Sequence, residues 1–226
     1  MSTFPSIPDL FSCQDGRDVS LRPLYELENG SLAGIEPDFV DTFLKIGDRL
    51  DTIMEVLSKG YGLTGPEAFI CAPMGEKELG DPGFPGALAQ YCQQMGAAPS
   101  NLCLFFADDL CLKHGHRALD QFLYFKRHGF RLGLDITNLQ TMPGLFVERL
   151  PADVLRLDPL DTSIRQEDPD SIQDIQAFTR YAANLLMVPA ARGVRSLGQL
   201  NMLKDVGIRI GQGPLFSTPS TQSLTT

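Results

Sequence analysis

Short apolar runs alternate along the chain with longer segments in which apolar residues recur every three or four positions. The runs typical of strands lie at 68–72, 102–106, 131–135, 154–157, 185–189 and 208–210. The segments typical of helices lie at 37–59, 84–95, 118–128, 143–150, 171–183 and 197–206. Repeated alternation of this kind predicts an α/β domain, and so many repeats within one domain favour a closed barrel.

The first part of the pattern predicts a hairpin. Residues 21–35 contain two apolar runs separated by Glu28-Asn29-Gly30, and Asn-Gly is a strong turn signal. The chain shows no internal repeat and no linker long enough to divide it. We therefore expect a single domain over residues 1–226, with a core of about 19–219 and a flexible tail at 220–226.

Composition narrows the class of protein. The chain has 226 residues, 43% hydrophobic and 21% charged, which is ordinary for a globular domain. No apolar run approaches the roughly 18 residues of a membrane span, and no signal-peptide pattern opens the sequence, so a cytoplasmic location is expected. The five cysteines form no CxxC pair, which favours reduced thiols. A net charge of −9 argues against nucleic acid or an anionic membrane as partner.

Four segments in the second half carry a specific resemblance. Residues 132–136, 150–158, 191–195 and 211–219 read Leu-Gly-Leu-Asp-Ile, Leu-Pro-Ala-Asp-Val-Leu-Arg-Leu-Asp, Ala-Arg-Gly-Val-Arg and Gly-Gln-Gly-Pro-Leu-Phe-Ser-Thr-Pro. Their order and spacing resemble the EAL family of cyclic di-GMP phosphodiesterases, where the segments read roughly LDDFG, LPVDxLKID, AEGVE and QGYLFSKP. The resemblance implies a TIM-barrel-like (β/α)8 fold with an antiparallel first strand.

The resemblance also implies where a catalytic site would lie. In the family, acidic residues, an Asn and a Gln at strand ends hold two cations that clamp a phosphodiester and generate a hydroxide. This chain retains Glu36, Asp135 and Gln212 of that set. Other residues stand at the remaining positions: Pro73 for the Asn, Phe105 for a Glu, Ile136 for the second Asp, Arg156 for the Lys and Arg192 for another Glu.

The surroundings of Glu36 differ from the family pattern as well. Pro37 and Asp38 follow it in place of Ala and Leu. In the family, an Arg and a loop that help to hold the nucleotide usually follow this glutamate. Residues 37–40 instead have the pattern expected at the start of the next helix, so we expect that Arg and loop to be absent. Asp108 stands at a second acidic position, where a helix cap or a solvated loop residue is favoured over a ligand.

Charge decides against a metal pair. Replacing Glu by Arg at position 192 changes the local charge by two units, and each unit charge at about 4 Å is worth on the order of 4 kcal/mol at an effective dielectric near 20. Arg156 stays protonated and cannot exchange protons as a lysine can. We therefore expect no bound metal and no other cofactor. Glu36 or Asp135 would instead pair with Arg156 or Arg192, or the arginines would bind an anion such as the phosphates of cyclic di-GMP.

These residues lead to one expected function and two alternatives. The expected function is a degenerate, catalytically inactive EAL-like domain that regulates a bacterial signalling pathway by binding another protein. The first alternative is a non-hydrolysing cyclic di-GMP receptor. The second is residual metal-dependent phosphodiesterase activity through Glu36, Asp108 and Asp135. His114 and His116 are expected in a solvated loop, since no Cys or carboxylate stands at a spacing suited to a metal.

Overall fold

The computed structural model describes most of the chain, in several ranges. These are residues 4, 10–12, 18–38, 46–59, 68–137, 139, 144–157 and 169–216. The strands of the sheet are β1 (Leu10–Ser12), β2 (Asp18–Glu26), β3 (Leu32–Asp38), β4 (Phe69–Pro73), β5 (Leu102–Ala107), β6 (Arg131–Ile136), β7 (Val154–Leu157), β8 (Val188–Arg192) and β9 (Ile210–Gln212). The helices are α1 (Ile46–Lys59), α2 (Glu76–Gly80), α3 (Phe84–Gln94), α4 (Asp108–His114), α5 (His116–Arg127), α6 (Gly144–Val147), α7 (Pro169–Asn184) and α8 (Leu197–Asp205).

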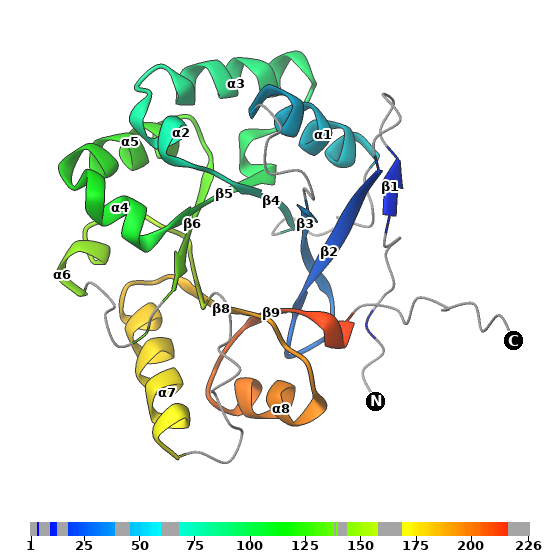
Figure 1. The fold of residues 1–226 in the computed structure, drawn as a ribbon, viewed down its shortest axis with the longest axis vertical. Coiled ribbons are helices and arrows are strands. Elements are labelled where there is room, and N and C mark those ends of the chain that lie inside the picture. The colour runs from blue at the N-terminus through cyan, green and yellow to red at the C-terminus, as the bar shows by residue number, and fades with distance from the viewer. Residues whose placement is uncertain are drawn as a thin grey trace, which may run out of the picture.

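The strands close into a barrel surrounded by helices (Figure 1). Strands β3 to β9 run parallel to one another. Strand β2 closes the ring by pairing antiparallel with both β3 and β9. Strand β1 adds to β2 from outside the ring. The predicted fold class is therefore confirmed, including the antiparallel first strand, and so is the hairpin, whose turn lies at residues 27–29.

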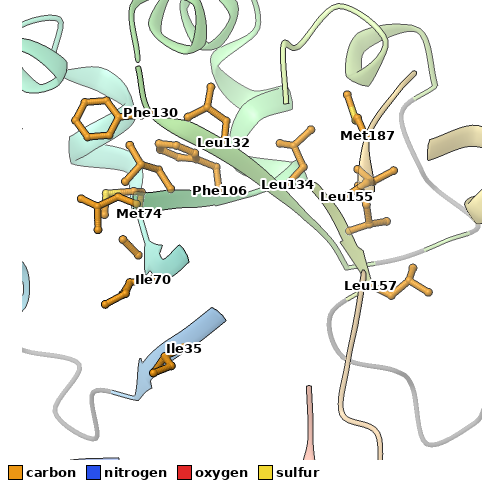
Figure 2. Packing of buried hydrophobic residues seen from close by; sticks show 14 of the residues in the cluster. Ile35, Ile70, Met74, Phe106, Phe130, Leu132, Leu134, Leu155, Leu157 and Met187 are labelled. Atoms are coloured by element: carbon orange, nitrogen blue, oxygen red, sulfur yellow. The ribbon is translucent and has the colours of Figure 1, made fainter. Parts of the chain in front are cut away.

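Side chains alternate between the two faces of the strands, as the period of two requires. Outward-facing residues such as Ile35, Ile70 and Phe106 pack in one continuous layer beneath the helices (Figure 2). A second, smaller cluster fills the interior of the barrel: Leu24, Ala33, Phe69, Cys71, Cys103, Phe105, Val154, Ala190 and Ile210. The interior of the barrel is therefore a packed core and not an open channel.

Two predicted strands lie two or three residues too early in the sequence. The runs at 185–189 and 208–210 were expected as strands, but β8 covers Val188–Arg192 and β9 covers Ile210–Gln212. Backbone bonds explain the shift, because Met187 and Ile208 donate back to Ala182 and Leu203. The first apolar residues after α7 and α8 thus close the helix ends instead of extending the strands.

The helix predicted over 37–59 also begins later than expected. Pro37 and Asp38 belong to β3, where they pair with Leu21 and Ser20 of β2. Among the described residues, β3 pairs with β4 only at residues 34–35, so Pro37 lies beyond the described ladder with β4, where a proline is tolerated. Helix α1 begins at Ile46, and residues 39–45 lie outside the described part.

Two short helices, α2 and α4, were not predicted. His114 is the last residue of α4 and His116 the first of α5, so neither histidine lies in the loop that the sequence suggested. The Nε2 atom of His114 lies 3.4 Å from Glu76 Oε1. Across the described ranges, no helix has the length and apolarity needed to cross a bilayer.

Candidate functional site

The carboxyl ends of the strands bring together most of the residues singled out by the sequence. Glu36 comes from β3, Asp135 from β6 and Arg156 from β7. Arg192 and Gln212 are the last residues of β8 and β9. Parallel strands end at one rim of a barrel, which is the reason for this convergence.

Arg156 lies at the centre of the cluster. Its Nε and Nη2 atoms donate to the two carboxylate oxygens of Asp135 at 2.6 and 3.0 Å. Its Nη1 atom donates to Glu36 Oε2 at 2.8 Å. The Arg156 side chain is only 1% exposed and that of Glu36 only 5%. One guanidinium therefore binds both retained carboxylates, and its pair with Asp135 has the bidentate geometry that makes such pairs strong.

Arg192 and Gln212 complete the shell around Glu36. Arg192 Nη2 donates to Glu36 Oε1 at 3.1 Å, and the Arg192 side chain keeps 25% of its surface exposed. Burial would raise the pKa of Glu36, but Arg156, Arg192 and a hydrogen bond from Gln212 outweigh it and hold that pKa below its ordinary value. Glu36 is therefore ionised in the folded protein over the neutral range.

The same pairing fixes the charge of Arg156. Burial disfavours the cation, but Glu36 and Asp135 more than compensate and raise the pKa of Arg156 well above its ordinary value. The cluster thus holds two carboxylates and two guanidinium groups, whose formal charges sum to zero. This arrangement satisfies buried charges that would otherwise be costly.

Phe105 forms a platform beneath Arg156. The Arg156 Cζ atom lies 4.0 Å from the centroid of the Phe105 ring, within the range of a cation–π contact. Gly133 faces Phe105 on the neighbouring strand, and a Cβ atom there would lie 2.4 Å from the ring. Sequence reasoning missed this glycine, although a glycine inside a strand is a known signal of close approach.

Three residues near the rim do not join the ionic cluster. Ile136 points outward into the apolar layer under the helices. Pro73 ends β4 beside Phe105 and offers no side-chain oxygen. Asp108 is buried as the first residue of α4 and accepts a hydrogen bond from Thr137 Oγ1 at 3.1 Å. It is therefore neither the solvated residue nor the N-cap that the sequence suggested, since the N-cap of α4 is Ala107.

These residues do not fit a pair of divalent cations. Hard cations require several oxygen ligands, mostly carboxylates, and Arg156 and Arg192 already bind both carboxylates of the cluster. In the described part of the chain, no three His, Cys, Asp or Glu side chains are grouped as a metal site would need. Burial, reinforced by Glu36, also raises the pKa of the Cys71 thiol well above its ordinary value, so Cys71 supplies no thiolate.

One buried polar atom in the cluster is unsatisfied. Gln212 Nε2 donates to the backbone oxygen of Arg22 at 3.4 Å, but Gln212 Oε1 is buried and has no hydrogen-bond partner among the described residues. Such an acceptor normally finds a donor, from the protein, a water molecule or a ligand. Beside it, Arg22 forms an ion pair with Asp38. The Gln212 side of the mouth is thus the part of the cluster that could still accept a hydrogen bond.

Fold and site together define a class of protein, an α/β barrel that gathers charged and polar side chains where its strands end. The family model for the EAL domain matches residues 52–219. The chain therefore belongs to the EAL domain family. Glu36 lies ahead of the matched range, and the other members of the ionic cluster lie within it.

Solved structures share the fold. The PaMucR phosphodiesterase in complex with c-di-GMP aligns with a TM-score of 0.71 and 18% identity over 88% of this chain and 95% of that one. The EAL domain of Mycobacterium smegmatis DcpA aligns with a TM-score of 0.73 and 16% identity over 88% and 89%. Klebsiella pneumoniae BlrP1 with manganese and cyclic di-GMP aligns with a TM-score of 0.71 and 19% identity over 96% of this chain and 59% of that one. Identities this low show a common fold, and no match was found among curated protein sequences.

Proposed function

We propose that this chain is a non-catalytic EAL domain that acts in a bacterial cytoplasm by binding another protein of a signalling pathway. The observation that carries the proposal is the position of Arg156, whose guanidinium group binds Asp135 and Glu36 at once. A metal pair would have to displace this buried cation from both carboxylates. The solved relatives include phosphodiesterases by name, and the sequence pattern of the family implies acidic cation ligands where this chain has Phe105 and Arg192.

Charge and proton transfer both support the absence of hydrolysis. The cluster has no net negative charge to offset a dication, and bringing one close to two guanidinium groups is unfavourable. The raised pKa of Arg156 also prevents it from accepting or donating a proton in the neutral range. Neither a metal-activated hydroxide nor a general acid is therefore available from these side chains.

A turnover assay tests the catalytic part of the proposal. Purified protein is incubated with cyclic di-GMP and magnesium or manganese, and the linear product is measured against a no-enzyme control. We expect no product above that control. Metal-dependent turnover that is abolished by Asp135→Ala would overturn the proposal and establish residual phosphodiesterase activity.

A non-hydrolysing cyclic di-GMP receptor is the second candidate. It is favoured by Gln212 Oε1, which has no hydrogen-bond partner in the described part of the chain, and by the partial exposure of Arg192 at the same end of the barrel. A hydrogen-bond donor of the ligand could bind Gln212 Oε1 while one of its phosphates binds Arg192. Calorimetry with cyclic di-GMP, with and without magnesium or calcium, separates the two candidates. Micromolar or tighter binding, about −8 kcal/mol or more favourable, that Arg192→Ala weakens would favour the receptor.

The protein-binding part needs a reconstituted pair. A candidate partner captured by the intact chain is purified, and its affinity is measured in the absence of nucleotide. We expect a saturable complex that survives omission of metal and cyclic di-GMP. A partner whose binding depends entirely on added cyclic di-GMP would instead assign the chain to the receptor class.

A further inference from the structure

The amino-terminal ends of the barrel strands surround a hollow, which lies at the end of the barrel opposite the ionic cluster. It has a volume of about 560 Å³, within the range of about 300–1,000 Å³ that is typical of sites for small molecules. Five charged side chains line it: Glu26, Glu28, Arg131, Asp153 and Arg209. The hollow is therefore a candidate site for a charged or polar ligand, and none of the residues of the ionic cluster contributes to it.

Glu26 and Arg131 project into the hollow from opposite sides of the barrel. Strands β2 to β9 form the ring in chain order, so β6 stands opposite β2 (Figure 1). Glu26 lies two residues after Leu24 of the interior cluster, and Arg131 lies two residues before Gly133, which faces the interior Phe105 ring. Because side chains alternate between the faces of a strand, both charged side chains point inward. Eight strands about 4.8 Å apart enclose a ring about 15 Å across, so the two side chains leave a gap of several ångström between them.

The wall around Glu26 carries one negative charge in excess. Glu28, on the turn after β2, has no ion-pair partner in the part of the chain that the structure describes. Arg209 Nη2 lies 3.9 Å from Glu26 Oε1, and the Arg209 side chain is 62% exposed. A long and exposed ion pair contributes little to stability, so a ligand cation can replace Arg209 beside Glu26 at low cost.

The opposite wall carries one positive charge in excess. Lys126 Nζ lies 2.7 Å from Asp153 Oδ1, so the charge of Asp153 is balanced by a lysine of α5. The Arg131 Cζ atom lies 5.9 Å from the centroid of the Phe69 ring, within the range of a cation–π contact. That contact holds the guanidinium group of Arg131 over the floor of the hollow, where an anionic group of a ligand can bind it.

We propose that the hollow binds an elongated zwitterion, a molecule with an ammonium group at one end and a carboxylate at the other, such as an ω-amino acid or a short peptide. The ammonium group binds Glu26 and Glu28, and the carboxylate binds Arg131. The middle of the ligand lies against Leu186 and Val188, which line the hollow between the two walls. A ligand with a single charge meets only one wall, so both charges are needed. This site lies away from the carboxyl end of the barrel, so the inference does not depend on the proposed function.

An NMR titration of the full chain with ε-aminocaproate tests the site. We expect a Kd of about 1 mM or tighter. Hexylamine and hexanoate are the matched ligands, because each keeps the alkyl chain and only one of the two charges, and each should bind at least about threefold more weakly. Triglycine separates the two sources of the zwitterion. Tighter binding of triglycine than of ε-aminocaproate would assign a short peptide to the site, and the reverse order would assign an ω-amino acid.

Two variants place the ligand between the two walls. Glu28→Gln and Arg131→Gln should each raise the Kd for ε-aminocaproate by about threefold or more, whereas the control Arg180→Gln, at an exposed arginine of α7, should leave it unchanged. Glu28 lies on an exposed turn, so its variant tests the site even if Arg131→Gln fails to fold. The absence of binding at about 10 mM ε-aminocaproate, ten times the expected Kd, would overturn the proposal. Equally tight binding of hexylamine, or a Kd that neither variant changes, would also overturn it.

Discussion

The two ends of the barrel bury their side chains in opposite ways. At the carboxyl end, Glu36, Asp135, Arg156 and Arg192 neutralise one another, and the interior is closed by Phe105. At the amino end, charged side chains surround an open hollow instead and keep much of their surface exposed, 37% for Asp153 and 62% for Arg209.

This difference separates two kinds of role. Charged groups that satisfy each other leave little free energy for binding a charged ligand, because the ligand must first break existing pairs. Exposed charged side chains that stay hydrated carry no such cost. The end of the barrel that holds the active site in enzymes is thus the more self-sufficient end in this protein.

The largest expected effect comes from removing Arg156. Arg156→Met leaves Glu36 and Asp135 buried without their main partner, which should lower the free energy of unfolding by about 3–5 kcal/mol. Urea denaturation measures the loss, and Arg209→Met, at an exposed arginine of the other end, is the matched control. The neutral triple variant Glu36→Gln, Asp135→Asn, Arg156→Met should recover much of the loss. If the single variant is as stable as the wild type, the cluster is not what stabilises this end.

A smaller loss in the free energy of unfolding is expected when a methyl group is added beside the Phe105 ring. Gly133→Ala places a Cβ atom 2.4 Å from the ring, and overpacking of this kind costs about 1–3 kcal/mol. Phe105→Leu should relieve the clash, so the double variant should be more stable than additivity of the two single changes predicts. Additive losses would show that the strand, and not the ring, responds to the new methyl group.

At the other end, a substitution should stabilise the fold. Leu186 follows α7 with a left-handed φ of 59°. Leu186→Gly removes a side chain from this position, and we expect the free energy of unfolding to rise by up to about 1 kcal/mol. Thermal unfolding measures this change. The reverse exchange, Gly207→Leu, at the equivalent turn of α8, should cost a similar amount. A Leu186→Gly variant that is less stable than the wild type would mean that the leucine side chain itself stabilises the fold.

The sequence predicted the barrel and its hairpin because those depend on local signals: apolar periodicity and an Asn-Gly turn. It also suggested pairing between carboxylates and arginines at the strand ends, and Arg156 indeed pairs with both Glu36 and Asp135. It did not reveal that Phe105 and Gly133 fit together, because that contact joins two strands 28 positions apart in the sequence. Residue 186 gave no signal at all, since a leucine after a helix reads as the start of a strand.

The starts of β8 and β9 were misplaced for a related reason. Apolar character alone does not distinguish a residue that closes a helix from one that begins a strand, and Ile208 is buried in either role. Only the backbone bond from Ile208 to Leu203 decides it. Likewise, the burial of Asp108 depends on how α4 packs against the segment after β6, which no local pattern contains.

Acidification should change the free energy of unfolding least of all, and it tests what controls the ionisation of Glu36 at the carboxyl end. The pKa of Glu36 is lowered below its ordinary value of 4.5, so its ionisation stabilises the fold above that pH, and this contribution is lost as the pH falls through the lowered pKa. The stability difference between wild type and Glu36→Gln, measured by urea denaturation, should therefore be constant near neutral pH and narrow in acid. When Arg156 is replaced by Met in both proteins, the stability difference should depend less on pH, because Arg156 is the chief group that holds the pKa of Glu36 down. A difference that widens on acidification would mean that burial, and not the arginine pair, controls Glu36.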